Sequence, residues 1–350
     1  MTATLASPST THAEPVSRLH QLVPRLNRQS VDKHHDAYAD IAWDSPELAI
    51  GPDDPRCTLF DFDPLALTGW YRAQPPEVQA RIGLHRVCAA FRVGMQFENL
   101  LQRGLLAFAF RLPNGAPEYR YLHHEVIEES QHSLMFQELV NRSEMPVKGM
   151  PLWLRLVAPP TVTVIQRAFP ELFFFLVLGG EDPVDYLQRR QLREGSTHPL
   201  VERIMRIHIT EEARHIAFAR TYLKDLVPTL GPVRRTLLAT RIPMVLSIMA
   251  PLMVDPSMEL HREHGVPKAV LREARRSREG RRLRRESVAK LRRLCVELGL
   301  MTPVARRVWK AVGLWADDTV DTLRTLDGVD PSGQTAEADG GGEGSTGPSK

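Results

Sequence analysis

The stretch HITEEARHIAFA, residues 208–219, places His208, Glu212 and His215 four and then three positions apart. Residues with this spacing lie on one face of an α-helix. The same face continues through apolar residues on both sides, including Met205 and Ala219. A helix here would bury two imidazoles and a carboxylate, and a buried carboxylate is costly unless it is paired or bound to a metal ion.

The chain contains a second copy of this arrangement. In each copy, a glutamate on an apolar helical face precedes a Glu-x-x-His pair by 31 residues. The two copies comprise Glu98, Glu129 and His132, and Glu181, Glu212 and His215. A single Glu-x-x-His pair on a helix is common, but two pairs with equal spacing favour a shared function.

Four acids and three imidazoles that converge from four helices would enclose a compact, multivalent positive centre. One Glu from each of two helices and a Glu-x-x-His pair from each of the other two form the ligand set of ferritin-like di-iron four-helix bundles. Oxygen and imidazole ligands suit Fe or Mn, and the absence of thiolates argues against Zn and iron–sulfur sites. We expect two Fe ions, and a mixed Mn/Fe site stays open. The candidate metal ligands are Glu98, Glu129, His132, Glu181, His208, Glu212 and His215.

The candidate ligands have different expected roles. Glu129 with His132 would hold one ion, and Glu212 with His215 would hold the other, because each pair projects from one side of its helix. His208 lies one turn before Glu212 and would add a third nitrogen. The two remaining glutamates, from the partner helices, would bridge or cap the ions.

Several neighbouring residues leave alternatives open. Glu181 lies in the segment LGGEDP, near a predicted helix end, and Asp182 could take its place. We interpret the adjacent acids as groups that support the ligands or face solvent, namely Glu125, Glu128 and Glu211. His123 and His124 could line the site, but we interpret both as structural histidines.

The sequence predicts an all-α fold, a ferritin-like four-helix bundle core with additional N- and C-terminal helices. Helical periodicity runs through most of the chain, and no segment alternates as a strand does. We expect a disordered N-terminus over 1–16, one helical domain over 17–327 and a disordered tail over 328–350. Helices are predicted at 29–40, 75–110, 117–141, 160–181, 184–194, 197–226, 231–254, 267–298 and 302–325.

Bulk properties exclude several classes of partner and location. The net charge is only +3, so no strong field indicates nucleic acid. The three cysteines are far apart and odd in number, so we expect no disulfide framework. This cysteine content fits a reducing cytoplasm. The apolar runs FPELFFFLVLGG and IPMVLSIMAPLMV are shorter than the roughly 20 residues of a membrane span, so we expect buried helices and no transmembrane segment. The arginine-rich segment 268–293 is interpreted as a solvated helix face.

At the candidate ligands the chain resembles the p-aminobenzoate N-oxygenase family of non-haem di-iron arylamine oxygenases. The segment DAYADIAWDSPE (36–47) resembles the family's N-terminal segment. Its three metal-binding blocks resemble GMQFENLLQRGLL (94–106), YRYLHHEVIEESQHSLMFQELVNR (119–142) and HITEEARHIAFAR (208–220). The resemblance covers most of residues 25 to 325, and all seven of the family's four Glu and three His ligands have a counterpart.

The resemblance implies an enzyme, an O2-dependent monooxygenase. An external electron donor or reductase would reduce the iron pair, and O2 would bind as a peroxo-diferric species. A small-molecule arylamine, in secondary metabolism, would be converted to hydroxylamine, nitroso and nitro products. Two alternatives stay open, a C–H hydroxylase or other oxidase on the same scaffold and a non-catalytic ferritin-like iron-binding protein. A homodimer is a further option that the sequence does not test.

Overall fold

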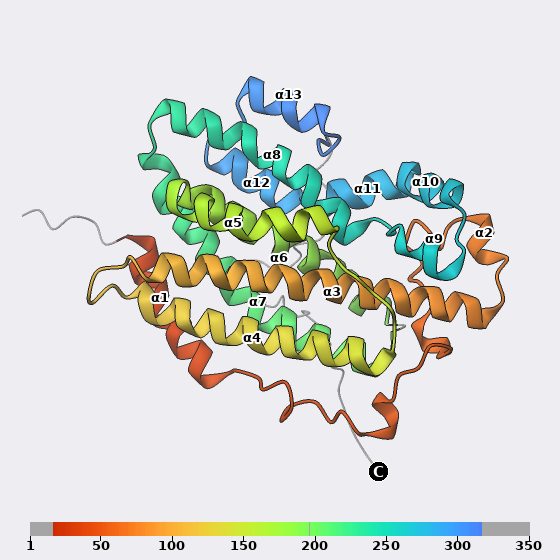
Figure 1. Ribbon diagram of the computed structural model, residues 1–350. Helices are drawn as coiled ribbons and strands as arrows, with labels where there is room; N and C mark the ends of the chain where they lie inside the picture. The colour runs from red at the N-terminus through yellow and green to blue at the C-terminus, as the bar shows by residue number, and fades with distance from the viewer. Residues whose placement is uncertain (1–16, 196, 317–350) are drawn as a thin grey trace, which may run out of the picture. The chain divides into compact units, whose positions relative to one another are not determined.

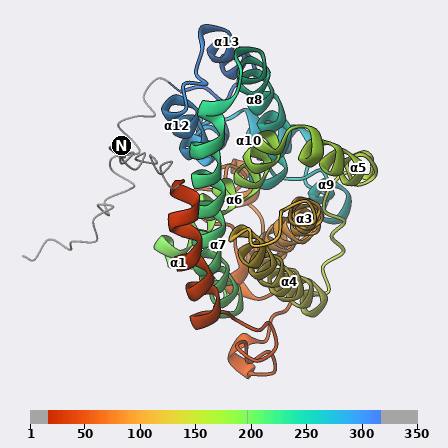
Figure 2. The same ribbon diagram turned by 90° about the vertical axis from the view of Figure 1, so that its left-hand side faces the viewer.

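Four long helices form a bundle, and the candidate ligands lie at its centre. They are α3 (Pro76–Ala109), α4 (Glu118–Ser143), α6 (Pro170–Glu194) and α7 (Pro199–Leu226). Helix α3 packs along α4, α6 packs along α7, and the two pairs meet through α4 with α7 and α3 with α6. Figures 1 and 2 show the four helices side by side from two directions. This architecture confirms the predicted all-α, ferritin-like class.

The computed structural model describes residues 17–195 and 197–316, and no strand occurs in these two segments. Helix α1 packs on α7 and α4, α5 on α3 and α6, and α8 on α6. The C-terminal helices cover α6 and α8 (Figure 2). Predicted disordered segments 1–16 and 328–350 lie outside the described residues. The elements outside the bundle are α1 (Arg18–Asp32), η1 (Pro46–Leu48), η2 (Pro55–Cys57), α2 (Gly69–Arg72), α5 (Leu152–Ala168), η3 (Val227–Thr229), α8 (Pro232–Val254), α9 (Glu259–His264), α10 (Lys268–Arg276), α11 (Arg278–Ser287), α12 (Ala289–Glu297) and α13 (Pro303–Ala311).

Local sequence signals set the ends of the bundle helices. Prolines stand at the first turn of α3, α6 and α7. The N–H groups of a first turn have no partner within the helix, so the N–H that proline lacks is not needed there. The ring of His198 accepts the N–H of Leu200 and caps α7. Gly195 ends α6 with φ of 69°, a left-handed conformation that glycine adopts without strain. The predictions for α3, α4, α7 and α8 therefore agree with the structure to within a few residues.

The prediction of a helix over 29–40 was wrong. Helix α1 lies earlier, at Arg18–Asp32, where Ser17 accepts the N–H of His20. Beyond it, the Asp36 carboxylate accepts the backbone N–H groups of Tyr38 and Ala39, each at 2.9 Å. Such local side-chain bonds compete with the helical ladder and favour a turn.

The predicted break between 181 and 184 was also wrong. Helix α6 runs through Pro183, and the chain instead bends at Phe169–Pro170, between α5 and α6. Pro183 is buried, and α6 packs against α7 and α8, so tertiary packing outweighs the lost N–H bond. Glu181 consequently lies inside a helix rather than near its end. Helix α5 starts at Leu152, before the predicted residue 160.

The C-terminal predictions were too long. The segment 267–298 forms three short helices, because Ser277 caps a new helix by accepting the N–H of Gly280. Helix α13 ends at Ala311, followed by Gly313 with φ of 75°, whereas a helix to 325 was predicted. Residues 317–325 lie outside the described part of the chain.

The apolar run in α8 is half-buried. The segment Pro232–His264 is long and apolar enough to cross a membrane by length and composition, and 44% of its most apolar window is buried. One side of α8 packs on α6, while Met244 and Ile248 remain 47% and 46% exposed on the other. A core helix of a soluble protein meets the same criterion, so the expected absence of a transmembrane segment stays a prediction.

The arginine-rich segment takes part in internal contacts. Arg284 forms an ion pair with Asp255 at 2.6 Å, and Lys290 one with Asp185 at 3.2 Å. Arg275 donates to the carbonyl of Pro256. These contacts fasten α10–α12 to the rest of the protein and leave the segment less free than a purely solvated face.

Candidate metal centre

The seven predicted ligands meet in the middle of the bundle. Each of the four bundle helices contributes at least one, and each side chain belongs to a residue that is 2% exposed or less. Their donor atoms, together with an oxygen of Glu125, form groups in which every atom lies within 4.8 Å of the others. The groups are Glu98, His132, His208 and Glu212; Glu125, Glu129 and His215; and Glu98, Glu129 and Glu181.

Two carboxylates occupy the centre of the cluster. Glu129 lies 3.2 Å from His132 Nδ1 and 2.9 Å from His215 Nδ1. Glu212 lies 3.3 Å and 3.2 Å from the same two nitrogens. Each carboxylate thus lies between both imidazoles. This geometry favours shared carboxylates over the predicted scheme of one Glu-x-x-His pair for each ion.

The remaining predicted ligands lie at the two sides of this centre. His208 Nε2 is 3.6 Å from Glu98 and 3.7 Å from Glu212. Among the described residues, Glu98 Oε2 and Glu181 Oε1 are buried without a hydrogen-bond partner. The alternative ligand Asp182 points elsewhere, because both its oxygens accept from Arg220 at 2.7 Å. Glu181 is therefore the acid of this pair that belongs to the cluster.

Outer partners fix the orientation of the imidazoles. His132 Nε2 lies 2.9 Å from Glu211, and His215 Nε2 lies 2.8 Å from Glu128. Each acid comes from the helix opposite to its histidine, and it leaves Nδ1 directed to the cluster. Such partners set the tautomer and basicity of a metal-bound imidazole.

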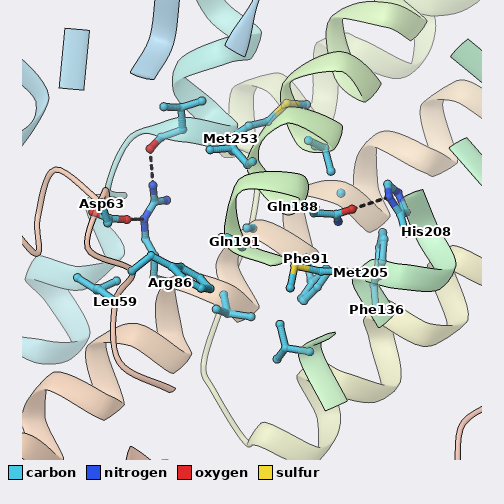
Figure 3. Close-up of a pocket in the computed structure, with 18 of the residues that line it drawn as sticks. Leu59, Asp63, Arg86, Phe91, Phe136, Gln188, Gln191, Met205, His208 and Met253 are labelled. Carbon is cyan, nitrogen blue, oxygen red and sulfur yellow. Dashed lines mark hydrogen bonds and ion pairs between the residues drawn. The ribbon is translucent and has the colours of Figure 1, made fainter. Parts of the chain in front are cut away.

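His208 is oriented in the opposite sense. Its Nδ1 lies 3.0 Å from Gln188 Oε1 on α6, so Nε2 faces the cluster. Figure 3 shows this pair at one end of a cavity. The third imidazole therefore has a neutral outer partner, whereas the other two have carboxylates.

The outer acids are themselves held by further contacts. Arg214 lies 2.9 Å from Glu128 and 3.7 Å from Glu211. His35, from the loop after α1, donates its backbone N–H to Glu211 at 2.9 Å. Both acids were predicted to support the ligands or to face solvent, and the structure shows them buried and paired.

The clustered carboxylates differ in their pKa values, because burial and neighbouring charges act on them to different extents. Burial raises the pKa of Glu98 and Glu181 well above the usual value, and the neighbouring acids add to the effect. Burial also opposes ionisation of Glu212, but His215 and His132 outweigh it and lower its pKa to about 2. Burial lowers the pKa of His208 to about 4, which keeps that imidazole neutral.

The site fits a pair of metal ions. It contains only carboxylate oxygens and imidazole nitrogens, the donors that suit Fe and Mn. In the described chain, buried oxygens of Glu98, Glu181 and Glu212 have no hydrogen-bond partner, although buried polar atoms in proteins are normally satisfied. A multivalent cation at the common centre would satisfy all of them.

An elongated cavity, called here the inner cavity, leads away from the cluster. Glu98, Glu181 and His208 line its inner end. Its walls are mainly apolar and include Phe91, Phe136, Met205, Leu187 and Val184. Figure 3 shows His208 near one end and the Arg86–Asp63 pair near the other.

The polar outer end of the inner cavity carries no unpaired charge. Arg86 Nε donates to Asp63 at 3.2 Å, and Arg86 also donates to the carbonyl of Val254. Gln191 adds a neutral polar group. Arg86 and Gln188 were not predicted as part of the site. Arg86 contacts Asp63 and Val254, and Gln188 contacts His208, so these contacts join different segments of the chain.

The two histidines interpreted as structural lie outside the cluster. His123 packs against the ring of Tyr119, with centroids 4.6 Å apart, and His124 contacts Arg120. Both are partly exposed. This agrees with the structural role assigned to them.

A four-helix bundle with a buried Glu/His cluster defines the class of ferritin-like proteins with a dinuclear centre. The chain belongs, more narrowly, to the family described as P-aminobenzoate N-oxygenase AurF, whose profile matches residues 17–299. The resemblance found in the sequence is thereby confirmed.

Known relatives share most of the chain. Uncharacterized proteins Rv0885 of Mycobacterium tuberculosis strain H37Rv and Mb0909 of Mycobacterium bovis are each 41% identical over 292 residues. The match covers 83% of this chain and 86% of each relative. No solved structure gives a significant match.

Proposed function

We propose that this protein is a non-haem di-iron oxygenase that uses O2 to oxygenate the nitrogen of an arylamine. The observation that carries the proposal is the enclosed set of four Glu and three His, which opens onto an apolar cavity in a member of an N-oxygenase family. The proposed ligands are Glu98, Glu129, His132, Glu181, His208, Glu212 and His215.

Two iron ions at these ligands would supply the reduction of O2, which amino-acid side chains cannot provide. Glu129 and Glu212, each in contact with both inner imidazoles, would hold the ions together. Glu128 and Glu211 keep those imidazoles in the tautomer that presents Nδ1. Metal analysis of the purified protein distinguishes Fe/Fe from Mn/Fe.

The inner cavity supports a role for a substrate rather than for stored iron. An amine group at the inner end would lie beside Glu98 and Glu181, and Phe91 and Phe136 would contact an aromatic ring. The apolar walls exclude water from the reacting group. An iron-storage protein would instead need a polar route for ions.

The proposed reaction balances with an external reductant. In the first cycle one oxygen atom of O2 enters an N–H bond of the amine and gives a hydroxylamine. The second oxygen atom leaves as water, which takes two protons and the two electrons supplied by a reductase. Repeated oxygenation would lead to nitroso and nitro products.

The test is single-turnover oxidation by iron-loaded, reduced protein. We expect arylamines to give N-oxygenated products that carry label from 18O2, measured by mass spectrometry. His132→Ala should abolish the product, whereas His123→Ala, on the same helix but outside the cluster, should retain it. A protein that holds two irons, consumes O2 and oxidises no amine would refute the proposal. Products hydroxylated at carbon would identify the C–H hydroxylase alternative, and shells with mineral cores in size-exclusion chromatography would identify iron storage.

A further inference from the structure

The two Glu-x-x-His helices are related position by position. Helices α4 and α7 carry the same run of an outer acid, a central acid and a histidine. One turn before the central acid, α7 carries His208, and α4 carries Glu125 at the corresponding place. The correspondence predicts that Glu125 faces the cluster from the side opposite to His208.

The surroundings of Glu125 agree with this expectation. The residue is 1% exposed, and an oxygen of its carboxylate lies within 4.8 Å of the donor atoms of Glu129 and His215. Neither carboxylate oxygen has a hydrogen-bond partner in the part of the chain that the structure describes. A carboxylate that supported the fold would accept hydrogen bonds, as Glu128 and Glu211 do.

We propose that Glu125 is an eighth metal ligand, which binds the ion on the His215 side. This inference rests on the proposed di-iron site. The ion on the His132 side would then have an additional imidazole, from His208, and the other ion an additional carboxylate. The added negative charge favours the higher oxidation state and tighter binding at the His215 side, so the two ions are unequal.

The test is anaerobic titration of the protein with Fe(II). Wild type should bind two ions, and Glu125→Gln should weaken one of the two steps by tenfold or more, while Glu125→Asp restores part of the affinity. His208→Ala should weaken the other step. Glu138→Gln is the matched control and should change neither step, because Glu138 lies on α4 outside the cluster, is partly exposed and pairs with Arg142.

A second readout separates ligation from a structural role. Removal of a buried, unpartnered carboxylate should raise the melting temperature of metal-free protein and reduce the increase that Fe(II) gives. A structural Glu125 would show the opposite change without metal. Two unchanged binding steps in Glu125→Gln would overturn the inference, whereas failure of wild type to bind iron would instead overturn the proposed function.

A separate observation concerns an apolar groove on the surface, called here the outer groove. It lies between α3, α5, α6 and α8, and Thr161 is the one polar side chain among the described residues that line it. Its rim is open to solvent, since Trp153, Val157 and Ile248 are 54%, 52% and 46% exposed.

The outer groove and the inner cavity share a wall. Phe97 and Met253 line both. A Cβ atom on Gly180 would lie 1.8 Å from the Phe97 ring, so glycine is required for the ring to occupy this place. Displacement of these two side chains would join the surface groove to the inner cavity.

We infer that the outer groove binds the apolar tail of the substrate whose reactive group lies at the metal centre. This inference rests on the proposed function, and it defines the substrate class as an amine or related compound with a neutral, extended apolar part. The pairing of Arg86 with Asp63 agrees with it, because the inner cavity then offers no free cation for an acidic substrate.

The test is equilibrium binding of 4-alkylanilines, from ethyl to decyl, to the iron-loaded protein without reductant. Affinity should increase up to about fourfold for each buried methylene. Val157→Asp should remove this dependence and leave aniline binding unchanged. Leu156→Asp is the matched control, because Leu156 is 67% exposed on the same helix but does not line the groove.

Other outcomes assign the groove differently. Affinity that does not depend on chain length would overturn the inference. A second result would also overturn it: the wild type is a dimer, and Val157→Asp makes it a monomer without changing how affinity depends on chain length. The groove would then be a contact between two copies of the protein. Length-dependent binding without amine oxidation would refute only the proposed reaction.

Discussion

The most informative perturbation is Glu128→Gln, which removes one charge from outside the ligand set and keeps the side-chain shape. In the wild type, Glu128 Oε2 is hydrogen-bonded to His215 Nε2 at 2.8 Å, and Oε1 forms an ion pair with Arg214 Nη2 at 2.9 Å. An amide has a single acceptor oxygen. The NH2 group must therefore face either His215 or Arg214, and the charge that pairs with Arg214 is lost in both cases.

The expected size of the effect follows from these contacts. The Glu128 side chain is 3% exposed, so solvent screens its interactions little. A hydrogen bond to a charged group contributes about 1.5–3 kcal/mol. Loss of the outer partner of a metal-bound histidine typically costs 10–100-fold in metal affinity, or about 1.4–2.8 kcal/mol. The two magnitudes agree, and we expect Glu128→Gln to weaken iron binding about 10- to 100-fold.

Competition with a chromophoric chelator measures this affinity, and the melting temperature of metal-free protein monitors the fold. Glu202→Gln is the control, because Glu202 on α7 pairs with Arg206 at the surface. If Glu128→Gln bound iron within about twofold of wild type, the idea that Glu128 positions His215 for metal binding would be wrong.

Three further predictions address the remaining features. Chelation should lower the melting temperature, because the clustered carboxylates lose their cation. Iron at 100 times its Kd stabilises the folded protein by about 2.7 kcal/mol. Equal melting curves with and without chelator would contradict a metal site. Gly180→Ala should lower the free energy of unfolding by about 1–3 kcal/mol through overpacking against Phe97, and urea denaturation would reveal an unchanged value if the ring can move freely. Cys57, Cys88 and Cys295 should resist thiol reagents at pH 8 in folded protein, since burial raises the pKa of each to about 12 and the reactive thiolate is then scarce; modification without denaturant would show that a buried thiol is accessible.

The sequence predicted the cluster well because its members obey helical spacing. Glu129 with His132, and Glu212 with His215, need only a regular helix to share a face. The repeat then indicated which earlier glutamates join them. The same repeat contained the signal for Glu125, which occupies the place of His208 but was interpreted only as a neighbour.

Other parts could not be predicted from local pattern. Pro183 suggested a helix end, yet packing keeps α6 continuous there. His35 and Gln188 reach the site through tertiary contacts that span 176 and 20 residues. No periodicity within one segment encodes such contacts.

The crossed contacts of Glu128 with His215 and Glu211 with His132 have a consequence for how such a chain could arise. Each helical hairpin supplies the carboxylate that orients the other hairpin's imidazole, so a single hairpin could complete the arrangement only by associating with an identical copy. Joining two such copies in one polypeptide removes the constraint of symmetry. Equivalent positions could then differ, as Glu125 and His208 do.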